Sequence, residues 1–497
     1  MGNDVVIADR SAAIGPINRR LFGAFVEHGG RGVYDGLYEP GHPLADADGF
    51  RTDVLDLVRE LGVTTARYPG GNFVSGYRWE DGIGPRQARP RRLDLAWHST
   101  ETNQIGVDEF AAWCRRAELE LIMAVNLGTR GIQEALDLLE YSNHPAGTTW
   151  SDQRMANGSV TPHGIRMWCL GNEMDGPWQI GQRSADDYGA LAARTAAAMR
   201  MIDRNLELVA CGSSWTGMPT FGEWERTVLE HCYESVDYIS CHAYYQEKNG
   251  DLGSLLASSA DMQHFIDTVT ATADHVRSRK RSTKTINIAF DEWNIWYQDQ
   301  QVRPDPADWP VAPRILEDVY TVADAVTVGS LLITLLKNCD RVTAASLAQL
   351  VNVIAPIMTE PGGPSWRQTT FFPFATTARL ARGTAYHPAI TTTTYETQRH
   401  GDAAHLDAVV TWAETEGAVL LVNRDQRGPR TIEIDLRSFA PSSVTEAVVL
   451  ADEDPYAVNT LADPYRVSPR ALKAVSLDGG RLTVVLPPTS WAAVAVR

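Results

Sequence analysis

The 497-residue sequence lacks the features that mark several large classes of protein. No window reaches the roughly 18 uncharged apolar residues that a membrane-spanning helix needs, and the best candidate, Val326–Leu336, is expected to be a buried helix. The opening residues, MGNDVVIADRS, contain no cationic segment followed by an apolar run, so we expect no secretory signal and a cytoplasmic location. Lys and Arg number 45 against 62 Asp and Glu, which argues against nucleic acid as a partner because phosphate binding needs clustered positive charge.

Motifs of several enzyme mechanisms are also missing. The six cysteines form no CxxC pair, so we predict buried free thiols rather than disulfides or a zinc site. The twelve histidines include no HExxH motif, and no metal site is expected. The sequence contains neither a GxSxG nucleophile elbow nor a GxxxxGK[ST] phosphate loop. These absences disfavour serine hydrolases, zinc hydrolases and P-loop enzymes.

Between about residues 20 and 350, short apolar runs alternate with helical stretches. The eight strand candidates are Leu21–Glu27, Thr64–Gly70, Leu121–Gly128, Ile165–Glu173, Leu206–Ser214, Val236–Tyr245, Ile286–Asn294 and Arg341–Leu350. The seven clear helices are expected over Thr52–Leu61, Val107–Ala117, Ile132–Tyr141, Ser184–Asn205, Gly222–Cys232, Leu252–Arg279 and Ala312–Leu336. Nearly continuous hydrophobicity is typical of parallel strands buried on both faces. Eight such units predict a (β/α)₈ TIM barrel, with an open doubly wound sheet as the alternative that no GxGxxG motif supports.

After about residue 375 the pattern changes to short, often alternating apolar runs separated by Gly, Pro or charged turns. This pattern is typical of an antiparallel β-sandwich. The first residues also form a strand candidate, which we expect to pair with the C-terminal sheet. The predicted organisation is an N-terminal strand over 1–18, a catalytic barrel over 19–374 and a C-terminal β-sandwich over 375–497.

The active site of a parallel barrel lies at the carboxyl ends of its strands, so polar residues there are informative. Asn172 and Glu173 end the fourth predicted strand, and Glu292 ends the seventh. Two carboxyl groups on different strands can converge across the barrel mouth. That arrangement suits retaining glycoside hydrolysis, in which one carboxyl group is the acid/base and the other is the nucleophile about 5–5.5 Å away. A structural ion pair at a strand end is the alternative interpretation of either glutamate.

Several longer segments resemble one enzyme family. They are RYPGGNFVSGYRWEDGIGP (Arg67–Pro85), LDLAWHSTETNQIGVDEF (Leu93–Phe110), MAVNLGTRG (Met123–Gly131), WCLGNEMDGPWQIG (Trp168–Gly181), AYY (Ala243–Tyr245) and FDEWNIWY (Phe290–Tyr297). From about residue 5 to the C-terminus the chain resembles glycoside hydrolase family 51, and within it the intracellular bacterial α-L-arabinofuranosidases. The resemblance implies a barrel with a β-sandwich built from both ends of the chain. It also implies that Glu173 is the general acid/base, that Glu292 is the nucleophile, and that no cofactor is needed.

The resemblance further implies the residues that bind sugar. Glu27, Asn72, Asn172 and Gln349 would hold the furanose hydroxyls. Tyr244 would donate a hydrogen bond to the nucleophile, although spacing alone does not distinguish it from Tyr245.

Other side chains near the strand ends have two interpretations each. Arg67 is expected either to hold Glu292 ionised through its positive charge or to form a supporting salt bridge. Trp97 and Trp296 fit an aromatic platform for the sugar or the leaving group, with simple packing as the alternative, and Trp178 is a weaker candidate. The alternative interpretation of Glu27 is that it caps a loop at the end of its strand. His242 is interpreted as structural.

The expected function is retaining, exo-acting hydrolysis of terminal α-L-arabinofuranosyl residues from arabino-oligosaccharides and arabinoxylan-derived oligosaccharides. The first alternative is the same machinery with β-xylosidase or endoglucanase specificity, and the second is a carbohydrate-binding protein without catalysis. The resemblance also implies a homo-oligomer, often a hexamer in this family. Neither nucleic acid nor membrane is expected as a partner.

Overall fold

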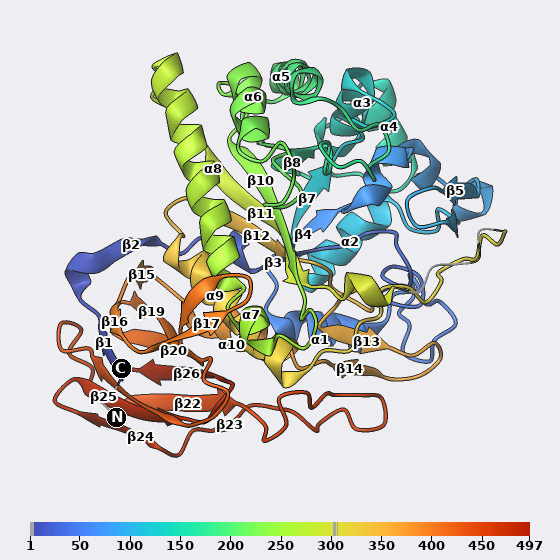
Figure 1. Ribbon diagram of the computed structural model, residues 1–497. Helices are drawn as coiled ribbons and strands as arrows, with labels where there is room; N and C mark the ends of the chain where they lie inside the picture. The colour runs from blue at the N-terminus through green and yellow to red at the C-terminus, as the bar shows by residue number, and fades with distance from the viewer. Residues whose placement is uncertain (1–3, 302–304, 306) are drawn as a thin grey trace.

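The computed structural model describes residues 4–301, 305 and 307–497. It consists of a closed parallel barrel and a two-sheet β-sandwich (Figure 1). The sandwich contains both the first described strand and the last strand of the chain. The predicted fold class, a (β/α)₈ TIM barrel with a sandwich formed by the C-terminal region and the N-terminal strand, is confirmed.

The eight predicted barrel strands are all present and follow one another around the barrel in chain order. They are β3 (Gly23–Phe25), β4 (Thr65–Tyr68), β7 (Glu120–Ala124), β8 (Met167–Leu170), β9 (Glu207–Ala210), β10 (Tyr238–Tyr245), β11 (Asn287–Ile295) and β12 (Val342–Leu347). Apolar side chains such as Ile122, Met167 and Val209 fill the interior. At the amino end, Arg20 hydrogen-bonds to both Glu120 and Glu207, and these ion pairs link β7 and β9 below the core.

The helices around the barrel agree with the predicted ones at five positions and differ at four, one of which is the helix over Phe371–Leu380, which the sequence did not predict. The helices are α1 (Thr52–Leu61), α2 (Val107–Ala117), α3 (Ile132–Asn143), α4 (Thr149–Ala156), α5 (Ala185–Ile202), α6 (Glu223–Cys232), α7 (Leu252–Leu256), α8 (Ser259–Lys280), α9 (Val322–Lys337) and α10 (Phe371–Leu380). Helix α4 lies between the predicted helix over Ile132–Tyr141 and the fourth predicted strand, where the sequence predicts no helix. The single helix predicted over 252–279 is two helices, and the last barrel helix begins at Val322 rather than at Ala312, because Thr321 caps it through a hydrogen bond from the Asp324 backbone.

The sandwich is built from two sheets, one of five strands and one of seven. The five-stranded sheet contains β16 (Ala389–Thr391), β1 (Asp4–Ile7), β21 (Arg430–Asp435), β25 (Arg481–Leu486) and β24 (Val475–Asp478). The seven-stranded sheet contains β2 (Ala13–Pro16), β15 (Thr384–Tyr386), β19 (Leu406–Ala413), β20 (Glu416–Asn423), β26 (Ser490–Val496), β22 (Val444–Leu450) and β23 (Arg470–Ala471). The N-terminal segment therefore contributes a strand to each sheet, with β1 parallel to β21 and β2 antiparallel to β15.

Three short hairpins and several 3₁₀ turns complete the described chain. The hairpin strands are β5 (Arg92–Asp94), β6 (Ser99–Glu101), β13 (Ile357–Thr359), β14 (Ser365–Arg367), β17 (Thr394–Thr397) and β18 (Gly401–Ala404). The predicted boundaries after residues 18 and 374 stay predictions, and α10 runs across the second one. All six cysteines are buried and free, as predicted.

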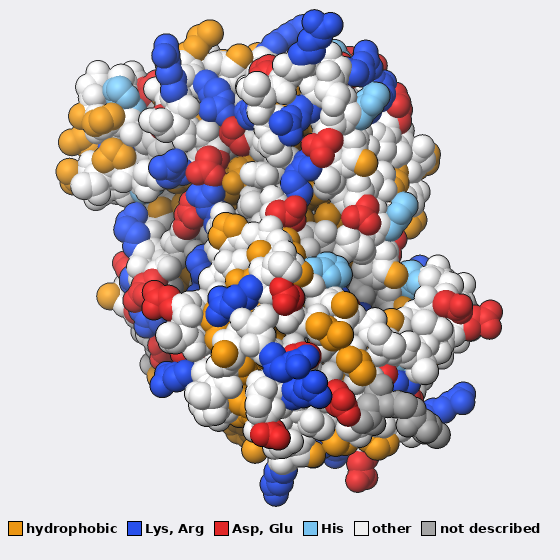
Figure 2. Space-filling model, turned by 90° about the vertical axis from the view of Figure 1, so that its left-hand side faces the viewer, with side chains coloured by type: hydrophobic (Ala, Val, Ile, Leu, Met, Phe, Trp, Pro, Cys, Tyr) orange, Lys and Arg blue, Asp and Glu red, His pale blue; other side chains and the backbone are white. Residues whose placement is uncertain are grey.

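The surface carries charges of both signs. On the face shown in Figure 2, basic and acidic side chains are interspersed. In the part of the chain that the structure describes, no helix is both long and apolar enough to cross a bilayer.

Helix α9 joins the two domains, because it packs against the sandwich strands β19, β20 and β26 as well as against the barrel (Figure 1). Gly329 of α9 lies directly on the buried Trp491 of β26. A Cβ atom at residue 329 would be 2.1 Å from Trp491 Cδ1, so only glycine allows this approach. A second contact is made by Arg424, which donates to the Leu256 carbonyl at 2.9 Å and to Ser259 Oγ at 2.8 Å.

We predict that Gly329→Ala lowers the free energy of unfolding by about 1–3 kcal/mol, because the added methyl group overpacks a rigid contact. Thermal unfolding should then begin at a lower temperature than in wild type. Gly428→Ala is the matched control, since a Cβ atom there meets nothing within 4 Å. Equal melting temperatures for both variants would contradict this account of the domain contact.

Candidate active site

Residues from six barrel strands or the loops after them meet at the carboxyl end of the barrel. The fully buried ones are Glu27, Arg67, Asn172, Glu173, Glu292 and Gln349, and the half-buried ones are Asn72, Trp97, Tyr244 and Trp296. The structure thus brings the predicted site residues to one end of the barrel. It also links most of them through direct hydrogen bonds.

The two predicted catalytic carboxyl groups lie close together. One ligand atom each from Glu173, His242 and Glu292 lies within 4.8 Å of the others. This separation is near the 5–5.5 Å of retaining glycosidases and well below the 6.5–9.5 Å of inverting ones. The Glu173 backbone has a φ of 43°, a left-handed conformation that non-glycine residues adopt rarely and that recurs at active sites.

His242 lies among three acidic side chains, Glu173, Asp291 and Glu292. Its Nδ1 atom is 3.0 Å from Glu173 Oε1, and its Nε2 atom is 3.0 Å from Asp291 Oδ1. Burial disfavours the charged imidazolium. The negative charge of Glu292 and the hydrogen bonds to Asp291 and Glu173 outweigh burial, and they raise the pKa of His242 well above its usual value. A doubly protonated imidazole donates through both ring nitrogens, which fits the position of His242 between Glu173 and Asp291.

Both oxygens of Glu292 accept hydrogen bonds. Arg67 Nη1 donates to Oε1 at 3.0 Å, and the Tyr244 hydroxyl donates to Oε2 at 2.7 Å. The other guanidinium nitrogens hold Asn172 Oδ1 at 2.6 Å and lie 3.3 Å from Asp291 Oδ2. One arginine therefore fixes three side chains at once, and Tyr244 rather than Tyr245 reaches the nucleophile.

A second set of contacts centres on Glu27. Its Oε1 atom accepts from Trp97 Nε1 at 2.6 Å and from the Phe73 backbone N–H at 3.0 Å, while Gln349 Nε2 donates to Oε2 at 3.1 Å. Gly71 makes room for this carboxyl group, because a Cβ atom there would be 2.1 Å from it. Burial outweighs these hydrogen bonds and, with the negative charges of Glu292 and Asp94, raises the pKa of Glu27 to about 8.

The remaining predicted residues are more loosely connected. Asn172 Nδ2 lies 3.5 Å from Asn72 Oδ1, which is a long hydrogen bond. The Trp296 ring packs edge-on against the Tyr244 ring with centroids 4.9 Å apart, so it supports the tyrosine directly.

Comparison with known proteins identifies the family. Family models match for the alpha-L-arabinofuranosidase 1 domain over residues 57–268, the alpha-L-arabinofuranosidase C-terminal domain over 291–490, and glycosyl hydrolases family 39 over 165–382. An intracellular exo-alpha-(1->5)-L-arabinofuranosidase from Streptomyces lividans is 57% identical over 488 residues, which cover 97% of this chain and 74% of that protein. An exo-alpha-(1->6)-L-arabinofuranosidase from Bifidobacterium longum is 56% identical over 505 residues, covering 99% of this chain and 97% of that protein.

A solved structure agrees with these matches. A family 51 alpha-L-arabinofuranosidase from Bifidobacterium longum is 52% identical, covers 100% of both chains, and has a TM-score of 0.96. The chain belongs to glycoside hydrolase family 51. The family predicted from the sequence motifs is therefore confirmed.

Sequence reasoning missed three side chains in this family 51 site. Trp178 Nε1 donates to Glu173 Oε2 at 2.5 Å, although it was the weaker tryptophan candidate. His242 was interpreted as structural, yet it touches the predicted acid/base. Asp291, next to the nucleophile, was not considered; burial alone would raise its pKa, but Arg67 and His242 outweigh burial and lower it below the usual value.

A bulge explains why Asp291 was missed. Strand β11 has one residue more than β10 between the pairs Ser240–Ala289 and His242–Glu292. In a regular strand, consecutive side chains point to opposite faces, so the sequence predicts that only one of Asp291 and Glu292 faces the site. The extra residue re-aims the strand, and both carboxylates reach Arg67.

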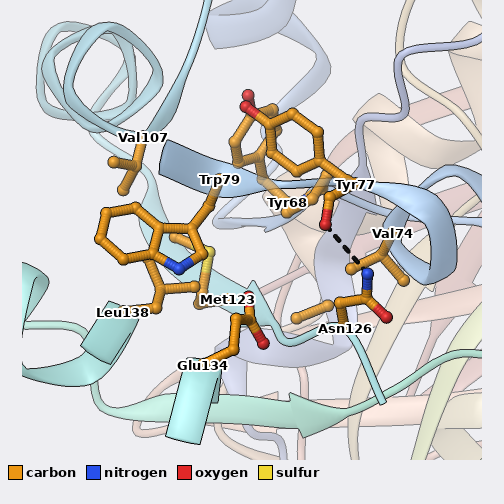
Figure 3. A pocket seen from close by; sticks show the side chains of 11 residues that line it. Tyr68, Val74, Tyr77, Trp79, Val107, Met123, Asn126, Glu134 and Leu138 are labelled. Carbon is orange, nitrogen blue, oxygen red and sulfur yellow. Dashed lines mark hydrogen bonds between the residues drawn. The ribbon is translucent and has the colours of Figure 1, made fainter. Parts of the chain in front are cut away.

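A small pocket lined by buried residues lies near the site but is too small to hold a sugar. Tyr68, Val74, Trp79 and Glu134 are among its lining residues (Figure 3). Its volume of about 10 Å³ has room for about one water molecule, far less than a sugar needs. Burial raises the pKa of Glu134 to about 8, which marks a carboxyl group enclosed by packing.

We predict that Glu27→Gln changes how stability depends on pH. With a pKa of about 8 in the folded protein against an ordinary value of 4.5, the folded state holds an extra proton between these values. Unfolding free energy therefore falls as pH rises through this window, by at most about 1.4 kcal/mol per pH unit from this group. The glutamine variant lacks this proton, so its unfolding free energy should fall less steeply.

Denaturant unfolding from pH 5 to 8 measures the difference between wild type and variant. Glu453→Gln, an exposed position in the sandwich, is the matched control and should parallel wild type. A Glu27→Gln curve that also parallels wild type would show that Glu27 is ionised in the folded protein.

Proposed function

We propose that this protein is a retaining, exo-acting α-L-arabinofuranosidase. It removes terminal non-reducing α-L-arabinofuranosyl residues from arabino-oligosaccharides and arabinoxylan-derived oligosaccharides by double displacement. The observation that carries the proposal is the close pair of buried carboxyl groups, Glu173 and Glu292, with ligand atoms within 4.8 Å of each other. The arabinofuranosidase names of relatives that are more than 50% identical support the sugar.

In the first half-reaction, Glu292 attacks the anomeric carbon while Glu173 gives its proton to the leaving oxygen. The bond from the anomeric carbon to that oxygen breaks as the ester to Glu292 forms. The hydrogen bonds from Arg67 and Tyr244 hold the carboxylate of Glu292 oriented for this attack.

In the second half-reaction, a water molecule takes the place of the leaving group. Glu173, now ionised, accepts a proton from the water as its oxygen attacks the anomeric carbon, and the ester to Glu292 breaks. Two inversions at one carbon restore the original anomeric configuration. His242 acts as a positioning residue, because it is tied to Glu173 on one side and to Asp291 on the other.

The sugar itself is assigned to the buried end of the site. Glu27, Asn72, Asn172 and Gln349 offer amide and carboxyl groups to the furanose hydroxyls, with Trp97 beside Glu27. Asn172 is next to the acid/base and is suited to the 2-hydroxyl, a contact that strengthens in the transition state. The burial of Glu27, Asn172 and Gln349 suits a terminal residue and hence exo action.

The names of the relatives differ in the linkage that is cleaved: one is named for α-1,5 bonds and another for α-1,6 bonds. We therefore propose no single linkage. The alternative of β-xylosidase or endoglucanase specificity has no comparable support among these relatives. For location we propose the cytoplasm, which fits the word intracellular in the names of several relatives. We also propose a homo-oligomer, with arabinofuranosyl oligosaccharides as the binding partners and neither nucleic acid nor membrane among them.

We predict that wild type hydrolyses an aryl α-L-arabinofuranoside far faster than the matched β-D-xyloside or β-D-glucoside. Glu292→Ala should lose roughly 10³-fold or more in kcat, because no covalent intermediate can form. Glu173→Ala should lose about 10²- to 10⁴-fold on oligosaccharides but less on the aryl substrate, whose leaving group needs no proton. Added azide should accelerate Glu173→Ala and yield arabinofuranosyl azide, since azide attacks without a general base.

Release of the aryl alcohol and chromatography of the azide product give both readouts. Glu453→Ala is the control, because Glu453 is exposed, lies in the C-terminal sandwich and is not one of the site residues. This variant should match wild type. Undiminished turnover by folded Glu292→Ala would overturn the proposed nucleophile. Preference for the xyloside or glucoside would keep the mechanism but overturn the proposed substrate.

A further inference from the structure

Two large indole side chains are exposed at the rim of the barrel mouth. Trp178 is 48% exposed and follows strand β8, while Trp215 is 51% exposed and follows strand β9. Trp178 has a partner, because it donates to Glu173. Trp215 takes no part in the mechanism above, and its side chain is available to a ligand.

The backbone around Trp215 is held on both sides. Before it, Ser214 donates to Asp175 through its backbone N–H at 3.0 Å and through its hydroxyl. After it, Thr216 Oγ1 donates to Asp261 Oδ1 at 2.9 Å, and Asp261 also accepts from the Tyr245 hydroxyl at 3.2 Å. These hydrogen bonds of Ser214 and Thr216 fix the backbone at Trp215, and so they fix the point from which its exposed side chain extends.

The Trp215 ring lies against its own loop. A Cβ atom at Gly217 would be 2.3 Å from the Cη2 and Cζ3 atoms of this indole, so the glycine lets the ring rest on the backbone. Trp178 has the same relation to Gly176, where a Cβ atom would be 2.6 Å from the ring. Each indole thus packs against the backbone of its own loop and leaves about half of its surface exposed, so it can stack against a ligand.

The position of Trp215 relative to the proposed acid/base, Glu173, determines which part of the substrate it can contact. Asp175, which holds the Trp215 loop, is two residues from Glu173. In the proposed reaction the leaving group departs from the side of Glu173, because that residue gives it the proton. The rings that lie beyond the cleaved bond therefore extend over the loops that carry Trp178 and Trp215.

We propose that Trp215 binds a sugar residue of the leaving group by stacking against its apolar C–H face. The inference rests on the proposed function and adds a specificity-determining residue to it. Trp178 adjoins the cleaved bond through its contact with Glu173, and Trp215, one loop further, is assigned to a more distant residue. The enzyme should therefore distinguish oligosaccharides by length, although only the terminal arabinofuranose enters the buried pocket.

The test compares two substrates in several variants. We expect Trp215→Ala to lower the ratio of kcat/KM for linear arabino-oligosaccharides of three or more residues to kcat/KM for an aryl α-L-arabinofuranoside by roughly 5- to 10-fold. The loss should lie mainly in KM, and Trp215→Phe should recover part of it. Gly217→Ala keeps the indole but displaces it from the backbone, so it should lower the same ratio.

Tyr465→Ala is the control, because Tyr465 is an exposed aromatic residue of the sandwich, 73% exposed, and should leave both substrates as in wild type. An unchanged ratio in Trp215→Ala, or equal losses on both substrates, would overturn the inference. A smaller assembly in solution with an unchanged ratio would instead assign Trp215 to a contact with a second copy of the chain. If wild type itself cleaves no arabinofuranoside, the proposed function has failed, which is a different result from a failure of this inference.

Discussion

Three carboxylates share one small buried volume at the barrel mouth, and two cations make this possible. Glu173, Asp291 and Glu292 are each less than a tenth exposed, and without compensation their mutual repulsion and desolvation would be prohibitive. Arg67 contacts Asp291 and Glu292, and His242 contacts all three carboxylates. The close approach of the proposed acid/base and the proposed nucleophile, on which double displacement would depend, is therefore a property of this charge network rather than of the two glutamates alone.

The fold supplies the rigidity that the network needs. Neighbouring strands β10 and β11 carry three of its members, and a bulge in β11 turns two consecutive acidic residues toward one arginine. The sugar-binding end is built in the same way, since Trp97, Gln349 and the Phe73 backbone all donate to the single carboxyl group of Glu27. Strands β10 and β11 thus carry His242, Asp291 and Glu292, while Glu173 and the groups around Glu27 lie after the ends of their strands.

The sequence was sufficient for the features that follow from periodicity and motifs. All eight barrel strands, the sandwich, and the meeting of Glu173 with Glu292 were predicted, because buried parallel strands and strand-end carboxylates leave direct patterns. Asp291 and His242 left no such pattern, since a one-residue bulge and a contact between strands are tertiary features. The helix predicted from Ala312 started late for a related reason, because its first turn is fixed by the Thr321 cap and not by hydrophobicity.

The configuration of the first sugar released tests the central claim most directly. Proton NMR spectra recorded within the first turnovers, before the free sugar equilibrates, distinguish the two anomers of arabinofuranose. Because the carboxyl groups are close enough for a covalent intermediate, the account predicts that the α-anomer appears first and the β-anomer only later by mutarotation. Initial release of the β-anomer would mean a single displacement by water, and it would contradict the assignment of Glu292 as the nucleophile.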